Sequence, residues 1–412
     1  MNKYIFNKNN MTRKTIFLIC LIIYLIIIFS VEFTYRNVLY EKSIEYIEKI
    51  DQGGFLKYFF FFWAIIYLIG VIGVGILITL FCYPINIFFC HISFLLLSVF
   101  IMCIFKSLYA DPRPFWDIYL KLKKENITLE KPTECDSEFG NPSGHAFLNI
   151  YSLFLWHLFI SSNFVNRIES SVKKNLIKYF SFVLTIVCMG FVVYSRIHRQ
   201  MHSFNQIIHG TVIGLAFWFT FCYIFEYNKM SLNDFILFLD EWKFIIIPIF
   251  VVLYAVSLVF GLILHNDKEE EYKKILVEYC NFNENNMFGK NTAYISSIIF
   301  LIIGGYLGFL YMNRKNHNNL MVKILSKWNK GKILHTILIA LFSFALPGIL
   351  MISMIVIPFS AYVVKIIVVL ICQFLYGFLS FGPCFCFSCD KLKRSEIETQ
   401  ESLIMSENND EL

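Results

Sequence analysis

The chain has 412 residues, of which 57% are apolar and only 16% are charged, and its mean hydropathy is +0.61. A soluble globular protein is nearer half apolar and a quarter charged, so the composition predicts an integral membrane protein and excludes a disordered chain, a coiled coil and collagen. The net charge of +6 arises from 36 basic and 30 acidic residues that are sorted along the chain. Because they form no single patch, a soluble nucleic-acid-binding protein is excluded as well.

Long uncharged runs predict an all-α protein with about ten transmembrane helices, because a spanning helix needs roughly 20 mostly apolar residues. The first run, 15–31, follows several basic residues and is not followed by a small-residue cleavage site, so we expect a retained anchor helix. Residues 58–105 carry no charged side chain, and 333–383 are interrupted only by Lys365. Each of these stretches is expected to hold two helices, with Lys365 reaching back to the interface.

Basic residues in the short loops orient the predicted helices. Segments 1–14, 167–178 and 314–332 are rich in Lys and Arg, which favours both termini on the cytosolic side, although the 226–243 loop does not follow the rule. The sequon that begins at Asn126 then lies on the opposite side, and Asn126 is a glycosylation candidate.

The cysteines do not form a pair of CxxC motifs, and most lie in apolar runs. Cys135 and Cys280 are the two in predicted outer loops and could form a disulfide in an oxidising lumen, although the sequence does not fix their distance. A group just past the last apolar run is compatible with either palmitoylation or ordinary juxtamembrane thiols: Cys384, Cys386 and Cys389.

The C-terminal Asn-Asp-Glu-Leu is similar to a lumenal retention signal, but the predicted topology makes this tail cytosolic, so we interpret the similarity as chance.

Three short motifs place polar side chains where predicted helices begin or end. They are Lys106-x6-Arg113-Pro114, Asn141-Pro142-Ser143-Gly144-His145 and Ser195-Arg196-x5-His202-x3-Gln206. Ionisable groups at membrane depth are costly and usually functional. The number of intervening helices predicts that all three motifs share the non-cytosolic face.

This set of side chains suits phosphoryl transfer, which depends mostly on positioning and on stabilising negative charge. An Arg side chain can bond two phosphate oxygens at once, whereas Lys acts as a point charge. The Ser143 and Gly144 amides at a helix start would add oriented donors. Of two histidines, one can attack phosphorus while the other protonates the departing oxygen.

The three motifs, in this order, resemble the signature of the type 2 phosphatidic acid phosphatase superfamily, K-x6-R-P, P-S-G-H and S-R-x5-H-x3-D, over roughly residues 106–210. The resemblance implies that His202 is the nucleophile of a phosphohistidine intermediate and that His145 is the general acid. It also implies a phosphate site without a metal or other cofactor, formed by Lys106, Arg113, Ser143, Gly144 and Arg196. Gln206 stands where the family has the Asp that orients the nucleophile; its carbonyl can still accept the ring N–H but carries no full charge.

The family resemblance divides the chain into a phosphatase core with its anchor helix (1–226, six helices), a four-helix membrane half (227–383) and a polar tail (384–412). Residues 138–142 and 201–203 look like sphingosine-1-phosphate phosphatases, whereas Gln206, the Pro-Ser-Gly-His-Ala motif and residues 113–116 look like glucose-6-phosphatase. We therefore expect a phosphatase for a phosphate monoester and favour a lipid phosphate of the phosphatidate or sphingoid-base phosphate type as substrate. The alternatives are a sugar phosphatase, a head-group phosphotransferase, or a vestigial site on a transport protein.

These predictions imply a phosphorylated lipid or sugar as substrate and the bilayer as surroundings, with no nucleic acid and no identified protein partner. The expected location is the endoplasmic reticulum or another endomembrane, with a lumenal site.

His198 and His202 have the i,i+4 spacing of a metal pair, but no carboxylate or thiol lies near them in sequence, so a zinc site is disfavoured. His198, Arg199 and His209 are interpreted as accessory polar groups.

Overall fold

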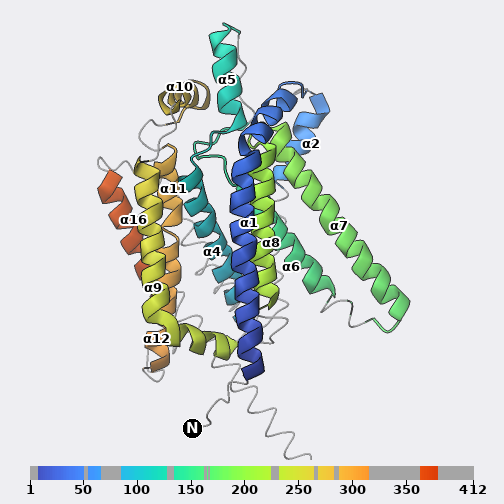
Figure 1. The fold of residues 1–412 in the computed structure, drawn as a ribbon, viewed down its shortest axis with the longest axis vertical. Helices are drawn as coiled ribbons and strands as arrows, with labels where there is room; N and C mark the ends of the chain where they lie inside the picture. Colours follow the sequence, from blue (N-terminus) through green and yellow to red (C-terminus); the bar gives the residue numbers. More distant parts are fainter. Residues whose placement is uncertain are drawn as a thin grey trace, which may run out of the picture. The chain divides into compact units, whose positions relative to one another are not determined.

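The computed structural model describes residues 8–50, 54–65, 85–127, 134–161, 165, 168–223, 232–263, 268–282, 287–314 and 362–378. These residues form helices and connecting loops without a strand (Figure 1), so the predicted all-α class is confirmed. Across the described ranges, five helical stretches are long and apolar enough to cross a membrane: Ile19–Ile47, His91–Lys124, Ser171–His198, Glu241–Ile263 and Gly289–Gly308. The chain is therefore a multi-pass membrane protein. The count of ten stays a prediction, because 66–84 and 315–361 lie outside the described residues, as does the tail with its cysteines.

The chain divides into two compact units that are each discontinuous in sequence. The first contains Met1–Gly73, Phe105–Lys229 and Val259–Thr292, and the second contains Val74–Ile104, Met230–Leu258 and Ala293–Leu412. The expected domain boundary at 226/227 stays a prediction. Residues 259–292 group with the core, whereas 74–104 do not.

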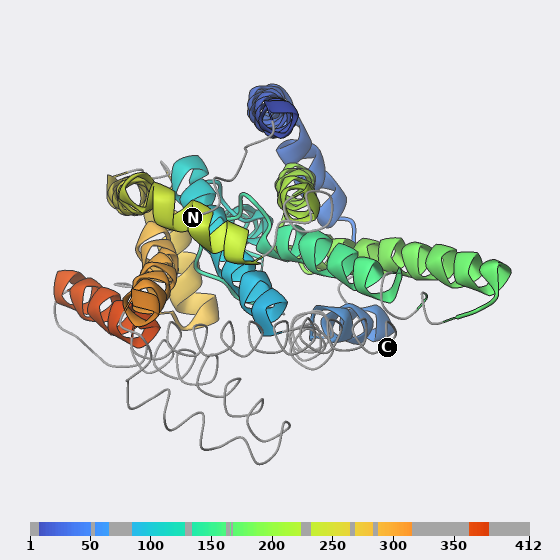
Figure 2. The same ribbon diagram turned by 90° about the horizontal axis from the view of Figure 1, so that it is seen from below.

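Four helices form the body of the first unit: α1 (Lys8–Ile47), α6 (Gly144–Phe159), α7 (Ser171–His198) and α8 (Phe204–Cys222). Helix α8 packs against α1 and α6, and α7 packs against α6 and α2 (Gly54–Ile65) (Figures 1 and 2). Many apolar side chains of α1 and α7 remain exposed, among them Ile26, Phe33, Leu176 and Phe180. Apolar faces of this kind are expected on helices that contact lipid.

The contact between α6 and α8 is close because Gly210 has no side chain. A Cβ added at Gly210 would lie 2.5 Å from the backbone oxygen of Ser143, which no real structure tolerates. The loop that starts α6 therefore rests directly on the backbone of α8, and this brings the second and third sequence motifs together.

A cap covers one end of the first unit (Figure 1). It consists of α5 (Pro114–Lys124), α10 (Glu269–Cys280) and the loops 134–143 and 287–288. Its core is mostly aromatic and includes Trp116, Phe139, Tyr272 and Phe288, all less than 5% exposed. A disulfide joins Cys135 to Cys280, so the predicted bridge is confirmed. The Asp117 carboxylate, which accepts hydrogen bonds from the Tyr40 and Tyr272 hydroxyls at 2.8 and 2.7 Å, ties the cap to α1.

The termini of the cap helices follow from local sequence. Helix α5 begins with Pro114 at its first position, where no backbone N–H is needed, and its last turn carries three lysines that suit the negative end of the helix dipole. Helix α10 begins with three glutamates, which suit the positive end of the helix dipole. The residue that follows it, Asn281, takes the left-handed conformation common after helices.

The second unit contains α12 (Ile299–Arg314) and α16 (Tyr362–Tyr376), which pack against each other, together with most of α4 (Ile85–Tyr109) and α9 (Leu232–Ile263). Its core is apolar and includes Phe100, Tyr254, Ile299 and Ile303. The short helix α11 (Gly289–Ser296) begins in the first unit and ends in the second.

Candidate active site

The predicted site residues all belong to the first unit and stand at helix ends. The set comprises Lys106 in the last turn of α4, Arg113 and Ser143 as the residues preceding α5 and α6, Gly144 and His145 in the first turn of α6, Arg196 in the last turn of α7, His202 in the loop before α8, and Gln206 in the first turn of α8. The loops 110–113 and 199–203 are short and keep the ends of α4 and α7 next to the starts of α5 and α8. The structure therefore brings together motifs up to about 100 residues apart in sequence.

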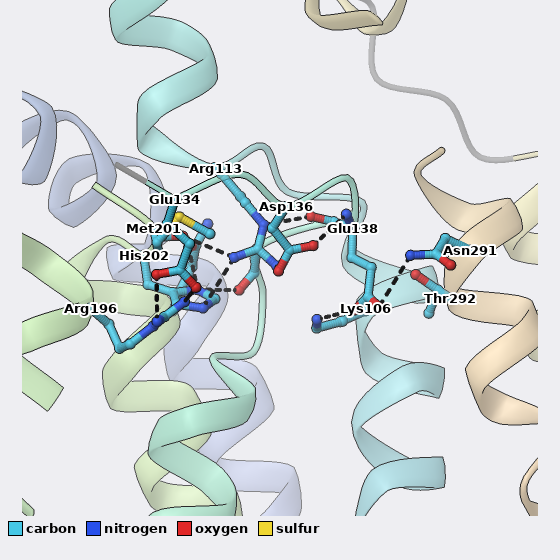
Figure 3. A network of polar contacts seen from close by, with 12 residues as sticks. Lys106, Arg113, Glu134, Asp136, Glu138, Arg196, Met201, His202, Asn291 and Thr292 are labelled. Carbon is cyan, nitrogen blue, oxygen red and sulfur yellow. Dashed lines mark hydrogen bonds and ion pairs between the residues drawn. The ribbon is translucent and has the colours of Figure 1, made fainter. Parts of the chain in front are cut away.

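Arg113 and His202 are in direct contact (Figure 3). The Arg113 Nη1 lies 3.3 Å from His202 Nε2 and 3.2 Å from the backbone oxygen of Met201. The charges of Arg196, Arg113 and Lys106 also act on His145, and His145 acts on His202. The two histidines and the three cations therefore form one cluster.

The hydrogen bonds of His202 define its tautomer. Its Nδ1 lies 2.9 Å from the backbone oxygen of Gly140. A carbonyl oxygen can only accept, so Nδ1 carries the proton, and Nε2 is left with its lone pair toward Arg113, which can only donate. Burial, followed by the charges of Arg113 and Arg196, holds the pKa of His202 well below its ordinary value. The imidazole is therefore neutral at physiological pH, with Nε2 able to act as a nucleophile.

Gln206 lies where the sequence predicts it, but the nearest acceptor for His202 is a different group. Gln206 Oε1 is 3.3 Å from His202 Nδ1, farther than the Gly140 oxygen, and it also accepts the Ser203 N–H at 3.2 Å. Its Nε2 donates to the backbone oxygen of Pro112 at 2.8 Å. Gln206 thus holds the loops around His202 in place, while the Gly140 carbonyl is the main acceptor.

The start of α6 differs in detail from the expected anion site. The Ser143 amide donates to the backbone oxygen of Gln206 at 2.9 Å, and the Ser143 hydroxyl accepts from the amide of Ala146 as a helix cap. The Ser143 amide is therefore engaged within the protein. The amides of Gly144 and His145 are in the first turn, where α-helical geometry supplies no intrahelical acceptor, and the expected role of this turn in binding an anion stays a prediction.

One loop pairs with all the cations. Arg196 makes a two-point ion pair with Glu134, Arg113 pairs with Asp136, and Lys106 pairs with Glu138 (Figure 3). Burial by itself would raise the pKa of Asp136, but the charges of Arg113 and Lys106 outweigh it and hold that pKa below its ordinary value. From sequence, Cys135 is a disulfide candidate and residues 138–142 carry a subfamily resemblance, but no role was assigned to the three acids of the Glu-Cys-Asp-Ser-Glu run.

A second buried polar network holds the loop that carries Gly140; the sequence points to its members Asn141 and His209 but not to the acids that they join. The Asn141 side chain donates to Glu32 at 3.1 Å and to Asp111 at 2.9 Å, and its oxygen lies 2.8 Å from His209 Nδ1. Asp111 also accepts the Gly140 N–H through its backbone oxygen at 2.8 Å and pairs with Arg36. Helix α1 is thereby linked to the backbone segment that orients His202, and His209 is part of this network.

Within the ranges that the structure describes, no group of three His, Cys, Asp or Glu side chains is arranged to hold a metal ion. His198, the other half of the i,i+4 pair, is buried, with its ring 4.6 Å from the ring of Phe60.

Residues 87–230 match the family model of the PAP2 superfamily. The matched segment contains all three motifs, and the match supports membership of the type 2 phosphatidic acid phosphatase superfamily. Membership implies a phosphatase that acts on phosphate esters, with a phosphorylated substrate. Comparison with curated proteins and with solved structures finds no match.

The close contact between Gly140 and Gln206 gives a testable prediction. A Cβ at Gly140 would lie 2.6 Å from Gln206 Nε2 and Oε1, which are held by Pro112 and Ser203. The G140A substitution must shift either the acceptor of His202 or Gln206, so we expect kcat for a phosphomonoester to fall about 100-fold. The matched control is G190A on α7, where a Cβ meets nothing within 4 Å. Equal kcat for both variants would contradict the assigned role of Gly140.

Proposed function

We propose that this protein is an integral-membrane phosphatase that hydrolyses a phosphate monoester through a phosphohistidine at His202. The observation that supports this most directly is the hydrogen bonding of His202. Its Nδ1 proton is directed to the Gly140 carbonyl at 2.9 Å, and its Nε2 faces Arg113 at 3.3 Å. A neutral histidine whose unprotonated ring nitrogen lies beside a buried guanidinium suits in-line attack on phosphorus.

The proposed reaction has two steps. In the first, the Nε2 lone pair forms an N–P bond while the P–O bond to the alcohol breaks, and His145 gives its proton to the departing oxygen. In the second, His145 takes a proton from water as the water oxygen attacks phosphorus, and the N–P bond breaks to release phosphate and neutral His202. Lys106, Arg113, Arg196 and the first-turn amides of α6 stabilise charge on the equatorial oxygens.

The proposed substrate is a lipid phosphate of the phosphatidate or sphingoid-base phosphate type. The site stands at the ends of α4 and α7, two helices that belong to stretches apolar enough to cross a membrane. A phosphate at such a position can be bound while an attached acyl or sphingoid chain remains in the hydrocarbon region. A glucose-6-phosphatase-like activity is the second candidate, since Gln206 takes the position of the usual Asp.

The proposed site faces the lumen of the endoplasmic reticulum or another endomembrane compartment. The Cys135–Cys280 disulfide supports this orientation, because Cys135 lies between two acids that pair with the site cations, and disulfides persist in oxidising compartments.

Replacement of the proposed nucleophile tests the mechanism. We expect H202A to lose at least about 1,000-fold in kcat and to form no acid-labile phosphoenzyme, because no other group carries the N–P bond. H157A is the matched control, since His157 lies on α6 with its Nδ1 2.7 Å from the Ser181 hydroxyl, away from the site. Full activity in purified H202A protein would overturn the mechanism.

A substrate panel tests the lipid assignment. Phosphate release by detergent-solubilised protein is measured for phosphatidate, a sphingoid-base phosphate, a dolichyl phosphate and glucose 6-phosphate. We expect kcat/KM for a lipid phosphate to exceed that for glucose 6-phosphate at least about tenfold, because the apolar chain adds binding free energy. A preference for the sugar phosphate would favour the second candidate, and a new phospholipid formed only when an acceptor lipid is present would favour phosphotransfer.

Glycosylation tests the orientation. Asn126 is exposed at the end of α5, in the cap that carries the disulfide. If the cap is lumenal, the protein expressed in eukaryotic cells is expected to shift in mass on treatment with an endoglycosidase, and N126Q is expected to abolish the shift. Sealed microsomes expose only the cytosolic face of the membrane to an impermeant reagent. Labelling of an engineered cysteine at position 126 in such microsomes would instead indicate a cytosolic cap.

A further inference from the structure

The acidic loop, residues 134–138, carries a carboxylate at every second position, and each of them contacts a different cation of the proposed phosphate site. Glu134 binds Arg196 through both guanidinium Nη atoms, at 2.9 and 3.0 Å, and also pairs with Arg199 at 2.7 Å. Asp136 accepts from Arg113 at 2.5 Å, and Glu138 from Lys106 at 2.5 Å. Figure 3 shows these side chains converging on the cluster.

These ion pairs use the donor atoms that a phosphate needs. Of the donors of Arg113, Nη2 is bound to Asp136, Nε donates to the backbone oxygen of Glu138 at 2.7 Å, and Nη1 faces Met201 and His202. Arg196 presents both Nη atoms to Glu134. Among the described residues Arg196 Nε has no hydrogen-bond partner, but the Nη edge of Arg196 and Nη2 of Arg113 face carboxylates. A tetrahedral anion that binds these guanidinium edges therefore competes with the carboxylates for them.

The charge balance leads to the same conclusion. Four cations, Arg196, Arg199, Arg113 and Lys106, stand against three carboxylates, and Arg113, Arg196 and Lys106 are at most 4% exposed. Adding a phosphate dianion to this nearly balanced group would leave excess negative charge in a buried place, where charge is poorly screened. The charge balance therefore disfavours a state in which the phosphate dianion and all three carboxylates are bound to the cations at once.

The acidic loop is also held next to the cations by the rest of the cap. Cys135 is linked to Cys280 of α10, and the Ser137 backbone oxygen accepts the Phe288 N–H at 2.7 Å. Asn291 donates to Glu138 at 3.4 Å. Tethering gives the carboxylates a high effective concentration at the cations, so they remain competitive with an incoming anion.

From these contacts we propose that Glu134, Asp136 and Glu138 are an internal competitor for the phosphate site, displaced when a substrate phosphate binds and re-formed as product phosphate leaves. This inference rests on the proposed phosphatase function. The three residues are positioning residues, since they act through the cations. Their contribution is to weaken the binding of free phosphate and so to promote product release.

The test compares isosteric amide variants, E134Q and E138Q, with the wild type. The control is E48Q, whose carboxylate pairs with Lys121 at 2.8 Å on the exposed surface. The measured quantities are the Kd of inorganic phosphate, from ligand-dependent thermal shifts in detergent, and kcat and KM separately. We expect Kd and KM to fall about tenfold in each variant and kcat to fall as product release slows, because the competing charge is lost.

A purely structural role for the acidic loop predicts a different outcome. Removing a counterion from a buried cation would then lower the melting temperature without tightening phosphate binding. Unchanged or weaker phosphate binding in E134Q and E138Q would overturn the proposal.

A measurement on the wild-type protein covers the case in which the variants do not fold. Hydrogen exchange of the peptide that contains residues 134–138 is followed with and without inorganic phosphate. Faster exchange with phosphate is expected if the carboxylates are displaced, and unchanged or slower exchange overturns the proposal. If the wild type hydrolyses phosphomonoesters but the variants do not bind phosphate more tightly and the exchange of residues 134–138 is not faster with phosphate, only this inference is wrong. If it neither hydrolyses any ester of the panel nor binds phosphate, the proposed function falls with it.

Discussion

The burial of positive charge at converging helix ends is the constraint on which the rest of the site depends. Arg113 and Arg196 are each 1% exposed. A guanidinium removed from water to this extent is stable only when carboxylates and carbonyls take the place of its hydration. The acidic loop and the backbone oxygens of Glu138 and Met201 provide this replacement. The same requirement makes the site attractive to a phosphate, because both kinds of anion satisfy the same donors.

The candidate nucleophile is oriented by backbone rather than by a charged side chain. The Gly140 carbonyl fixes the His202 tautomer, and Asn141 anchors that segment to Asp111 and to Glu32 of α1. Both acceptors near the His202 ring, the Gly140 carbonyl and the Gln206 amide, are neutral. No acid therefore stands beside the ring at the position where the family has an Asp. Helix α1, outside all three motifs, thereby acts on the geometry of the site.

The cap explains why a segment far from the motifs in sequence belongs with them. Helix α10 and residues 287–288 pack on α5 through Trp116, Tyr272 and Phe288, and the disulfide fixes α10 to the acidic loop. Residues 259–292 therefore group with the first unit. Since Asn291 contacts Glu138, this segment also reaches the cation cluster.

The sequence by itself determined the membrane class, the all-α fold, the superfamily and the side chains that form the cluster. These properties depend on local composition and on fixed spacings, such as the six residues between Lys106 and Arg113. Only the tertiary structure decided the partners of those side chains, which are the Gly140 carbonyl for His202 and Glu134, Asp136 and Glu138 for the cations. It also decided that α10 and residues 287–288 join α5 in the cap. A carbonyl has no sequence signature, and the partner of a carboxylate depends on which loops meet in space. Both are set by how the helices pack and not by their order.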